Sequence, residues 1–129
     1  MSRIDALRRM YQKRPDDSRL QFGLALEYLQ SGRTEEGIDL LEEYLATADD
    51  EGNGWGRLAA AYLEQDREDE ARKAYREGIE AARRHGHPTM AEEFEGALEE
   101  LGPTSSDAGP EVAADAPGGD GPPGSESGA

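Results

Sequence analysis

The sequence of 129 residues contains no cysteine and two histidines. The lack of cysteine excludes disulfides, thiolate zinc sites and thiol catalysis. No stretch approaches the roughly 18 apolar residues that a membrane-spanning helix needs. The N-terminus, Met1 to Asp5, lacks the apolar core of a signal peptide. We therefore expect a cytoplasmic protein without a membrane partner.

Positive charge is also scarce. Lys and Arg number 14 against 29 Asp and Glu, which gives a formal net charge of −15. Because nucleic acids and anionic membranes attract proteins through Lys and Arg, we expect neither as a partner. Twelve of the cations are Arg and two are Lys. This balance fits a halophilic cytoplasm, where salt screens self-repulsion, and it fits a GC-rich genome equally well.

Residues 102–129 have almost no apolar or aromatic content. The segment holds seven Gly, five Pro and five acids in 28 positions, and no Lys or Arg. Such a composition cannot offset the entropy of ordering the chain. The sequence therefore predicts a folded helical domain at 1–101 and a disordered acidic tail at 102–129.

A pattern of large and small residues repeats after 34 positions. Leu24, Ala25 and Tyr28 recur as Leu58, Ala59 and Tyr62, and the later pair Gly37 and Leu41 recurs as Ala71 and Tyr75. A period of this length is typical of arrays of helix-turn-helix units. Such arrays bind other molecules along a surface and rarely carry chemistry.

The pattern resembles the tetratricopeptide repeat, whose signature is W-x2-L-G-x2-Y, then A-x3-F, then P. The second copy fills these positions with Trp55, Leu58, Tyr62, Ala71 and Tyr75. The first copy departs at Gln21, Gly37 and Leu41, and neither copy has the final proline. The resemblance covers about residues 3–85, and the chain is similar to small bacterial members of the family. The resemblance implies a non-enzymatic protein-binding role. The residues of the second copy are expected to be buried between the fourth and fifth helices.

Helical spacing, caps and stop signals predict an all-α chain of about six antiparallel helices. Five of them have expected limits near 3–13, 18–30, 55–64, 68–85 and 89–101, and the third is expected between a cap at Thr34 and a loop at 48–54. Asp17, Thr34 and a Thr89–Glu92 capping box are the expected N-terminal caps. The helices add up to a half repeat, two full repeats and a capping helix, which we expect to be a complete small solenoid.

His85 and His87 are the candidate metal ligands. Two histidines with one residue between them chelate a metal when a carboxylate completes the site. Here they stand at a helix end and in a loop, so a helix-terminal role is the simpler interpretation. The chain lacks a nucleophile elbow, a phosphate loop and a His-Glu-x-x-His motif. We therefore expect a protein that is not an enzyme and that has no catalytic residue, no metal and no cofactor. The alternative is a metalloenzyme built on the two histidines.

The resemblance implies that the first helix of each pair lines a concave groove. Carried over by position, this candidate peptide-binding groove consists of Arg19, Phe22, Leu26, Leu29, Arg57, Ala60 and Leu63. The Lys/Asn clamp by which some family members grip a peptide carboxylate is absent at these positions, and the small Gly56 and Ala60 are expected to allow close approach of a partner's backbone.

Three alternatives stay open for this strip. It binds an unidentified protein or peptide, it pairs with its own copy as a homodimer, or a terminal helix covers it and uses it as core.

Overall fold

The computed structural model describes residues 2–102. Six α-helices follow one another within this range: α1 (Arg3–Lys13), α2 (Ser18–Gln30), α3 (Thr34–Thr47), α4 (Asn53–Glu64), α5 (Glu68–Arg84) and α6 (Pro88–Leu101). No strand occurs in this part of the chain. The tail predicted at 102–129 lies, from residue 103, outside the described residues.

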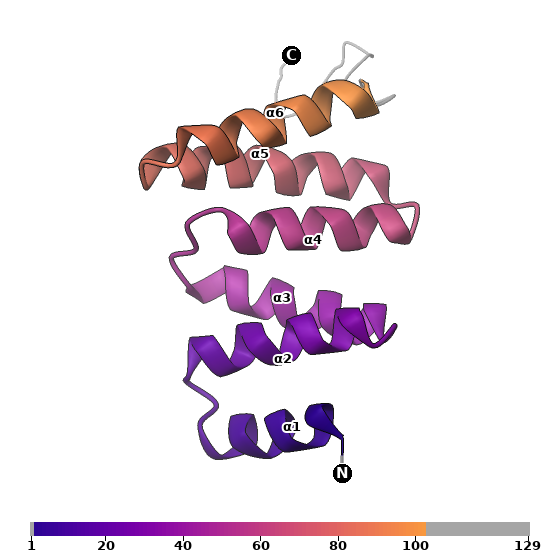
Figure 1. Cartoon of the computed structure of the whole chain (residues 1–129), viewed down its shortest axis with the longest axis vertical. Helices are drawn as coiled ribbons and strands as arrows, with labels where there is room; N and C mark the ends of the chain where they lie inside the picture. The colour runs from indigo at the N-terminus through magenta and orange to yellow at the C-terminus, as the bar shows by residue number, and fades with distance from the viewer. Residues whose placement is uncertain (1, 103–129) are drawn as a thin grey trace. The chain divides into compact units, whose positions relative to one another are not determined.

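Each helix lies beside the next, and turns of three to five residues reverse the chain between them (Figure 1). The helices α2 and α3 form repeat 1, and α4 and α5 form repeat 2. The helix α1 stands as the second helix of a leading half repeat, and α6 follows repeat 2 as the capping helix. The all-α repeat fold predicted from the period is confirmed. Both repeats and most of α6 belong to one compact unit, which ends at residue 97.

The start of several helices differs from expectation. Asp17 caps α2 as predicted, because its carboxylate accepts from the N–H groups of Arg19 and Leu20. Thr34 does not cap α3; the cap residue is Arg33, without a side-chain bond. The Thr89–Glu92 capping box is also wrong, because Pro88 already occupies the first helical position, which suits proline.

A capping box does occur at α1, where it was not predicted. The Ser2 hydroxyl accepts from the N–H of Asp5 at 3.1 Å, and the Asp5 carboxylate accepts from the N–H of Ser2 at 3.5 Å. Two N–H groups that lack a partner within the helix are satisfied in this way.

The repeat period places the same residue types in one continuous core. Leu24, Ala25 and Tyr28 of α2 are buried, as are their partners 34 residues later in α4. Ile38 and Leu41 of α3 are the largest side chains that are fully buried. These helices are held together by burial of their apolar faces, at roughly 25 cal/mol for each Å² removed from water.

The predicted core of repeat 2 is confirmed at Leu58, Tyr62 and Ala71, which are buried. Trp55 and Tyr75 were also expected to be buried, but both are half-buried and pack against the edge of the core. The predicted repeat register is confirmed, but these two aromatic rings are less deeply buried than expected.

The turn inside each repeat is fixed by an arginine. Arg33 lies over the ring of Tyr28 at 4.9 Å and forms an ion pair with Glu36. The equivalent Arg67 lies over the ring of Tyr62 at 4.7 Å and pairs with Glu70. In both turns the backbone N–H of the arginine also donates to the tyrosine carbonyl at 2.9 Å. The same clip therefore closes both helix pairs.

Candidate functional site

The predicted groove residues lie on the first helix of each repeat, and the structure leaves them partly open to solvent. Arg19, Arg57 and Ala60 are exposed. The apolar members Phe22, Leu26, Leu29 and Leu63 are half-buried. We call these seven residues the front strip. Its four large apolar side chains are therefore neither fully buried as core nor fully exposed.

Two side chains of the front strip are held from behind by α3. The ring of Phe22 packs on the ring of Tyr44 with centroids 4.9 Å apart. Leu29 covers Gly37, where an added Cβ would lie 2.6 Å from the leucine Cδ2. Such support limits the rotamers of Phe22 and Leu29, which is how a rigid binding surface is built.

The capping helix α6 packs on repeat 2 beside the front strip. The ring of Phe94 packs against two glycines, Gly56 of α4 and Gly78 of α5. A Cβ built on Gly56 would lie 2.7 Å from the ring, and one built on Gly78 would lie 2.9 Å from it. Phe94 also packs on Tyr75, with ring centroids 5.5 Å apart. The two glycines are therefore required by the approach of α6.

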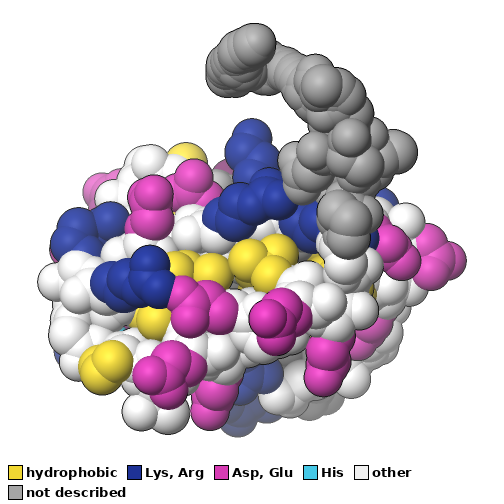
Figure 2. All heavy atoms as spheres, turned by 90° about the horizontal axis from the view of Figure 1, so that it is seen from above, with side chains coloured by type: hydrophobic (Ala, Val, Ile, Leu, Met, Phe, Trp, Pro, Cys, Tyr) yellow, Lys and Arg dark blue, Asp and Glu magenta, His cyan; other side chains and the backbone are white. Residues whose placement is uncertain are grey.

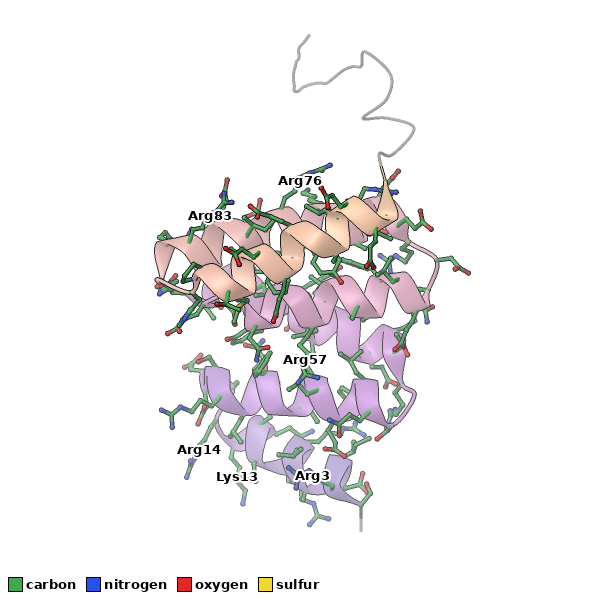
Figure 3. The ribbon with its side chains drawn as sticks, turned by 45° about the horizontal axis from the view of Figure 1, so that its top comes forward. Arg3, Lys13, Arg14, Arg57, Arg76 and Arg83 are labelled. Atoms are coloured by element: carbon green, nitrogen blue, oxygen red, sulfur yellow. The ribbon has the colours of Figure 1, made fainter. Side chains whose placement is uncertain are left out.

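This packing corrects one expectation. Gly56 was expected to admit the backbone of a binding partner, but the space above it is taken by Phe94 of the same chain. A small hollow of about 270 Å³ remains beside the ring, and Arg57 and Glu93 lie on its edge. A terminal helix therefore covers Gly56, which lies beside the front strip. Within the strip, Ala60 stays exposed. Arg57 is exposed as well (Figure 3).

The seam between α5 and α6 is apolar with charged edges. Seen from above, hydrophobic side chains form a stripe with Lys, Arg, Asp and Glu side chains around it (Figure 2). Arg83 of α5 and Glu95 of α6 form an ion pair across this seam. The pair is exposed on both sides, and such pairs contribute little to stability.

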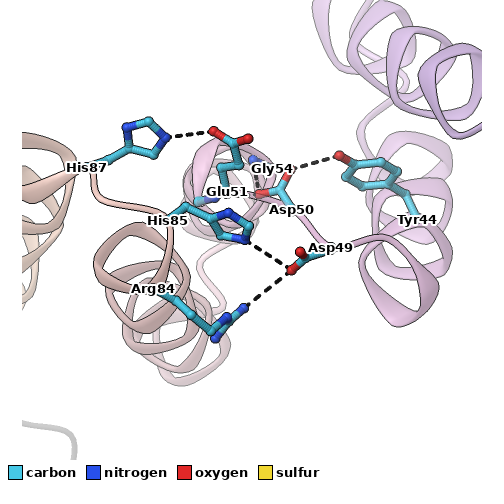
Figure 4. A network of polar contacts seen from close by, with 9 residues as sticks. Tyr44, Asp49, Asp50, Glu51, Gly54, Arg84, His85 and His87 are labelled. Carbon is cyan, nitrogen blue, oxygen red and sulfur yellow. Dashed lines mark hydrogen bonds and ion pairs between the residues drawn. The ribbon is translucent and has the colours of Figure 1, made fainter.

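The loop between the repeats is organised by a buried aspartate, Asp50, that the sequence did not single out. Its carboxylate accepts from the Tyr44 hydroxyl at 2.8 Å and from the N–H groups of Gly52 and Gly54 at 2.9 and 2.8 Å (Figure 4). Burial, with the hydrogen bond to Asp50, raises the pKa of the Tyr44 phenol above its usual range. Asp50 thus satisfies the N–H of Gly54 in the first turn of α4, whose N-cap residue is Gly52 and which begins at Asn53 rather than near Trp55. The spacing of Asp50 to two following glycines was the available signal.

His85 and His87 contact two different carboxylates of the same loop. Nε2 of His85 lies 3.1 Å from Asp49, and Nε2 of His87 lies 2.6 Å from Glu51 (Figure 4). The hydrogen bond from His85, helped by Arg84, lowers the pKa of the Asp49 carboxyl. The histidines therefore join the turn after α5 to the loop before α4 as two separate pairs.

Among the described residues, no three His, Cys, Asp or Glu side chains come together in a way that could hold a metal ion. Within residues 2–102, no helix has the length and apolar character to cross a membrane.

The opposite face of the repeats carries two hollows that the sequence did not predict. One, of about 350 Å³, lies between α3 and α5 above α4, with Trp55, Leu58 and Tyr62 among its lining residues. The other, of about 360 Å³, lies between α1 and α3 above α2, with Leu24 and Tyr28 among its lining residues. The 34-residue period is the sequence feature that could have predicted them, because the two hollows are lined by residues 34 positions apart.

The family model of the tetratricopeptide repeat matches residues 1–82. This range includes α1 to α4 and most of α5, and it leaves out α6. No curated protein matches the chain. The match contains both copies of the 34-residue period.

Proposed function

The chain belongs to the tetratricopeptide-repeat family, and from this we propose that it is a non-enzymatic interaction module that binds one protein segment on its front strip. Proteins of this family generally mediate protein–protein interaction, and their repeats are typically not catalytic. The finer proposal concerns the place of binding, which is α2 together with the second half of α4.

The observation that carries the proposal is the partial exposure of four large apolar side chains on one face. Phe22, Leu26, Leu29 and Leu63 are half-buried, on a chain whose net charge is −15. Apolar surface that stays open beside polar residues is typical of interaction sites. Because Phe22 and Leu29 are already held by α3, a partner has less side-chain entropy to remove on binding.

The two exposed cations of the front strip suggest how a partner is oriented. Arg19 and Arg57 stand at its edges and can each meet a carboxylate of the bound segment. We therefore propose an apolar segment with an acidic flank, bound as a helix or an extended peptide. The acidic surface argues against nucleic acid and anionic membrane as partners. We place this role in the cytoplasm.

Replacement of Leu26 by Glu tests the proposal. The variant should lose its partners from a native lysate at matched salt, because a buried interface anchor commonly contributes 2 kcal/mol or more. The change Ala60→Glu, at an exposed position, should have the same effect with less influence on folding. Glu80→Gln on α5 serves as the control that retains binding.

Retained capture by both front-strip variants would contradict the proposal. Loss of helical content in Leu26→Glu alone would show that this residue is core, and Ala60→Glu would then decide the question. Sedimentation distinguishes the alternative homodimer, because pairing of two front strips predicts a dimer that both variants dissociate.

A further inference from the structure

The hollow between α3 and α5, which we call the back groove, is separate from the front strip. At about 100° per residue, Trp55, Leu58 and Tyr62 face one side of α4, while Arg57 and Ala60 face the opposite side. The first three line the back groove. The two surfaces are therefore on opposite sides of the same helix, and a ligand of one does not contact the other.

The floor of the back groove is apolar and its rim is acidic. The floor includes the half-buried ring of Trp55 and the buried Leu58, and Ala74 adds apolar wall. The rim carries Glu42, Glu70 and Glu77 against a single Lys73. One of these acids, Glu70, is already paired with Arg67 at 2.7 Å. Glu42 accepts a hydrogen bond from the Tyr62 hydroxyl and lies at the edge of the groove.

The equivalent hollow 34 residues earlier is a weaker candidate. Its position corresponding to Trp55 is Gln21, which does not line it, and Arg8 replaces Glu42 on its rim. Each rim carries three acidic residues and one basic residue, so the tryptophan is the feature that the back groove has and the earlier hollow lacks. This difference selects the back groove as the site.

We propose that the back groove binds a cationic protein segment that carries an apolar anchor. The anchor lies against Trp55 and Leu58, and Lys or Arg side chains beside it meet Glu42 and Glu77. A cation placed near the tryptophan face gains a further attraction from the ring. Complementary charge also speeds the encounter and rejects acidic competitors. This partner is opposite in charge to the acidic segment proposed for the front strip.

The natural reporter for this site is Trp55, because it is the one tryptophan of the chain. The probe is a short amphipathic helix made of Lys and Leu, titrated into the full-length protein at about 0.15 M salt. We expect a saturable shift of the tryptophan emission. A Glu/Leu peptide should give none, and a Lys/Ser peptide should give a weaker one because it lacks the anchor.

Two matched variants show where the probe binds. Glu77→Lys reverses a charge on the rim, and Glu80→Lys makes the same change on an exposed position of α5 outside the groove. Since both variants have equal net charge, general attraction of the cationic probe falls equally. We expect Glu77→Lys to weaken the apparent affinity at least about tenfold relative to Glu80→Lys, as close charge pairs do.

Equal binding by the two variants would overturn the proposal, as would an emission that does not respond to the Lys/Leu probe. A shift that appears with protein concentration alone would show that a second copy occupies the groove, against the proposal. Leu26→Glu should leave the emission response unchanged, so failure of the front strip and failure of the back groove are told apart.

Discussion

The two repeats fill the same position of the fold in different ways. In repeat 1 an aromatic pair, Phe22 of α2 and Tyr44 of α3, occupies the space between the two helices. The residues 34 positions later are Gly56 and Gly78. In repeat 2 the missing rings are replaced by one ring from outside, Phe94 of α6.

This difference explains why repeat 1 and repeat 2 present different surfaces. Repeat 1 is closed by its own side chains, and its first helix keeps Leu26 and Phe22 partly exposed. Repeat 2 has a gap at its two glycines, and Phe94 of α6 fills this gap beside the front strip. A repeat array needs a terminal element that shields its last unit, and here that element contributes an aromatic ring to the unit it shields.

Removal of the inserted ring should have the largest effect. Phe94→Ala leaves a void beside Gly56 and Gly78, and we expect a loss of about 3 kcal/mol in the free energy of unfolding, near the lower limit for such truncations because the ring is half-buried. Denaturant unfolding measures this loss, and hydrogen exchange should show α6 opening first. A cost well below about 1 kcal/mol would remove the claim that repeat 2 depends on α6.

Glycine-to-alanine substitutions should change the stability in opposite directions in the two repeats. Gly56→Ala places a Cβ 2.7 Å from the Phe94 ring, so we expect it to destabilise by about 1–2 kcal/mol despite the better helix propensity of alanine. Gly23→Ala in α2 meets nothing within 4 Å and should stabilise by up to about 1 kcal/mol. Melting of the two variants side by side gives the comparison. A change of melting temperature in the same direction for both variants would contradict this difference between the repeats.

The turns of the two repeats differ in one residue with a left-handed backbone. Repeat 1 has Gly32 at φ 81°, and repeat 2 has Asp66 at φ 58°. Since aspartate adopts this conformation at a cost, Asp66→Gly should stabilise by about 0.5–1 kcal/mol, and Gly32→Asp should destabilise by a similar amount. Thermal melting measures both. Stabilisation by Gly32→Asp would show that the two turns are not equivalent.

The arginine clips of the two turns should make the smallest contributions to stability, and the two contributions should be similar. The hydrogen bond from Arg33 lowers the pKa of Glu36, and the one from Arg67 lowers the pKa of Glu70. A carboxyl with a lowered folded-state pKa adds stability above its unfolded value of about 4.3, and this stability is lost as the pH falls through the folded value.

The melting temperature of the wild type should therefore fall more steeply below about pH 4.3 than that of Glu36→Gln or Glu70→Gln. The effect of Glu70→Gln should be the larger, because the side chain of Arg67 is 32% exposed and that of Arg33 is 41% exposed. Parallel curves for the three proteins would show that the clips add nothing.

The period and the apolar spacing predicted all six helices, because both depend on which residues recur and at what interval. The end of α5 and the start of α4 were each misplaced by one or two residues. At α4 the cause is Asp50, a carboxylate outside the helix that accepts from the N–H of Gly54 in its first turn. An acceptor supplied from a loop leaves no mark in the helical pattern itself.

The site was less predictable than the fold. The sequence placed Leu26 and Ala60 on the first helices, where the structure has them. It did not predict that Phe94 would take the space above Gly56, because a contact over 38 positions depends on how α6 crosses repeat 2. The same limit hid the back groove, whose walls come from three separate helices.

The central claim is that a partner binds the open part of the front strip, and the lack of cysteine allows a direct measurement. A single cysteine is introduced as Ala60→Cys, and in a second protein as Glu80→Cys, both at exposed positions. The rate of thiol alkylation is then compared between free protein and the complex isolated from native lysate. We predict strong protection at position 60 and none at position 80; protection at position 80 with free reaction at position 60 would contradict the account.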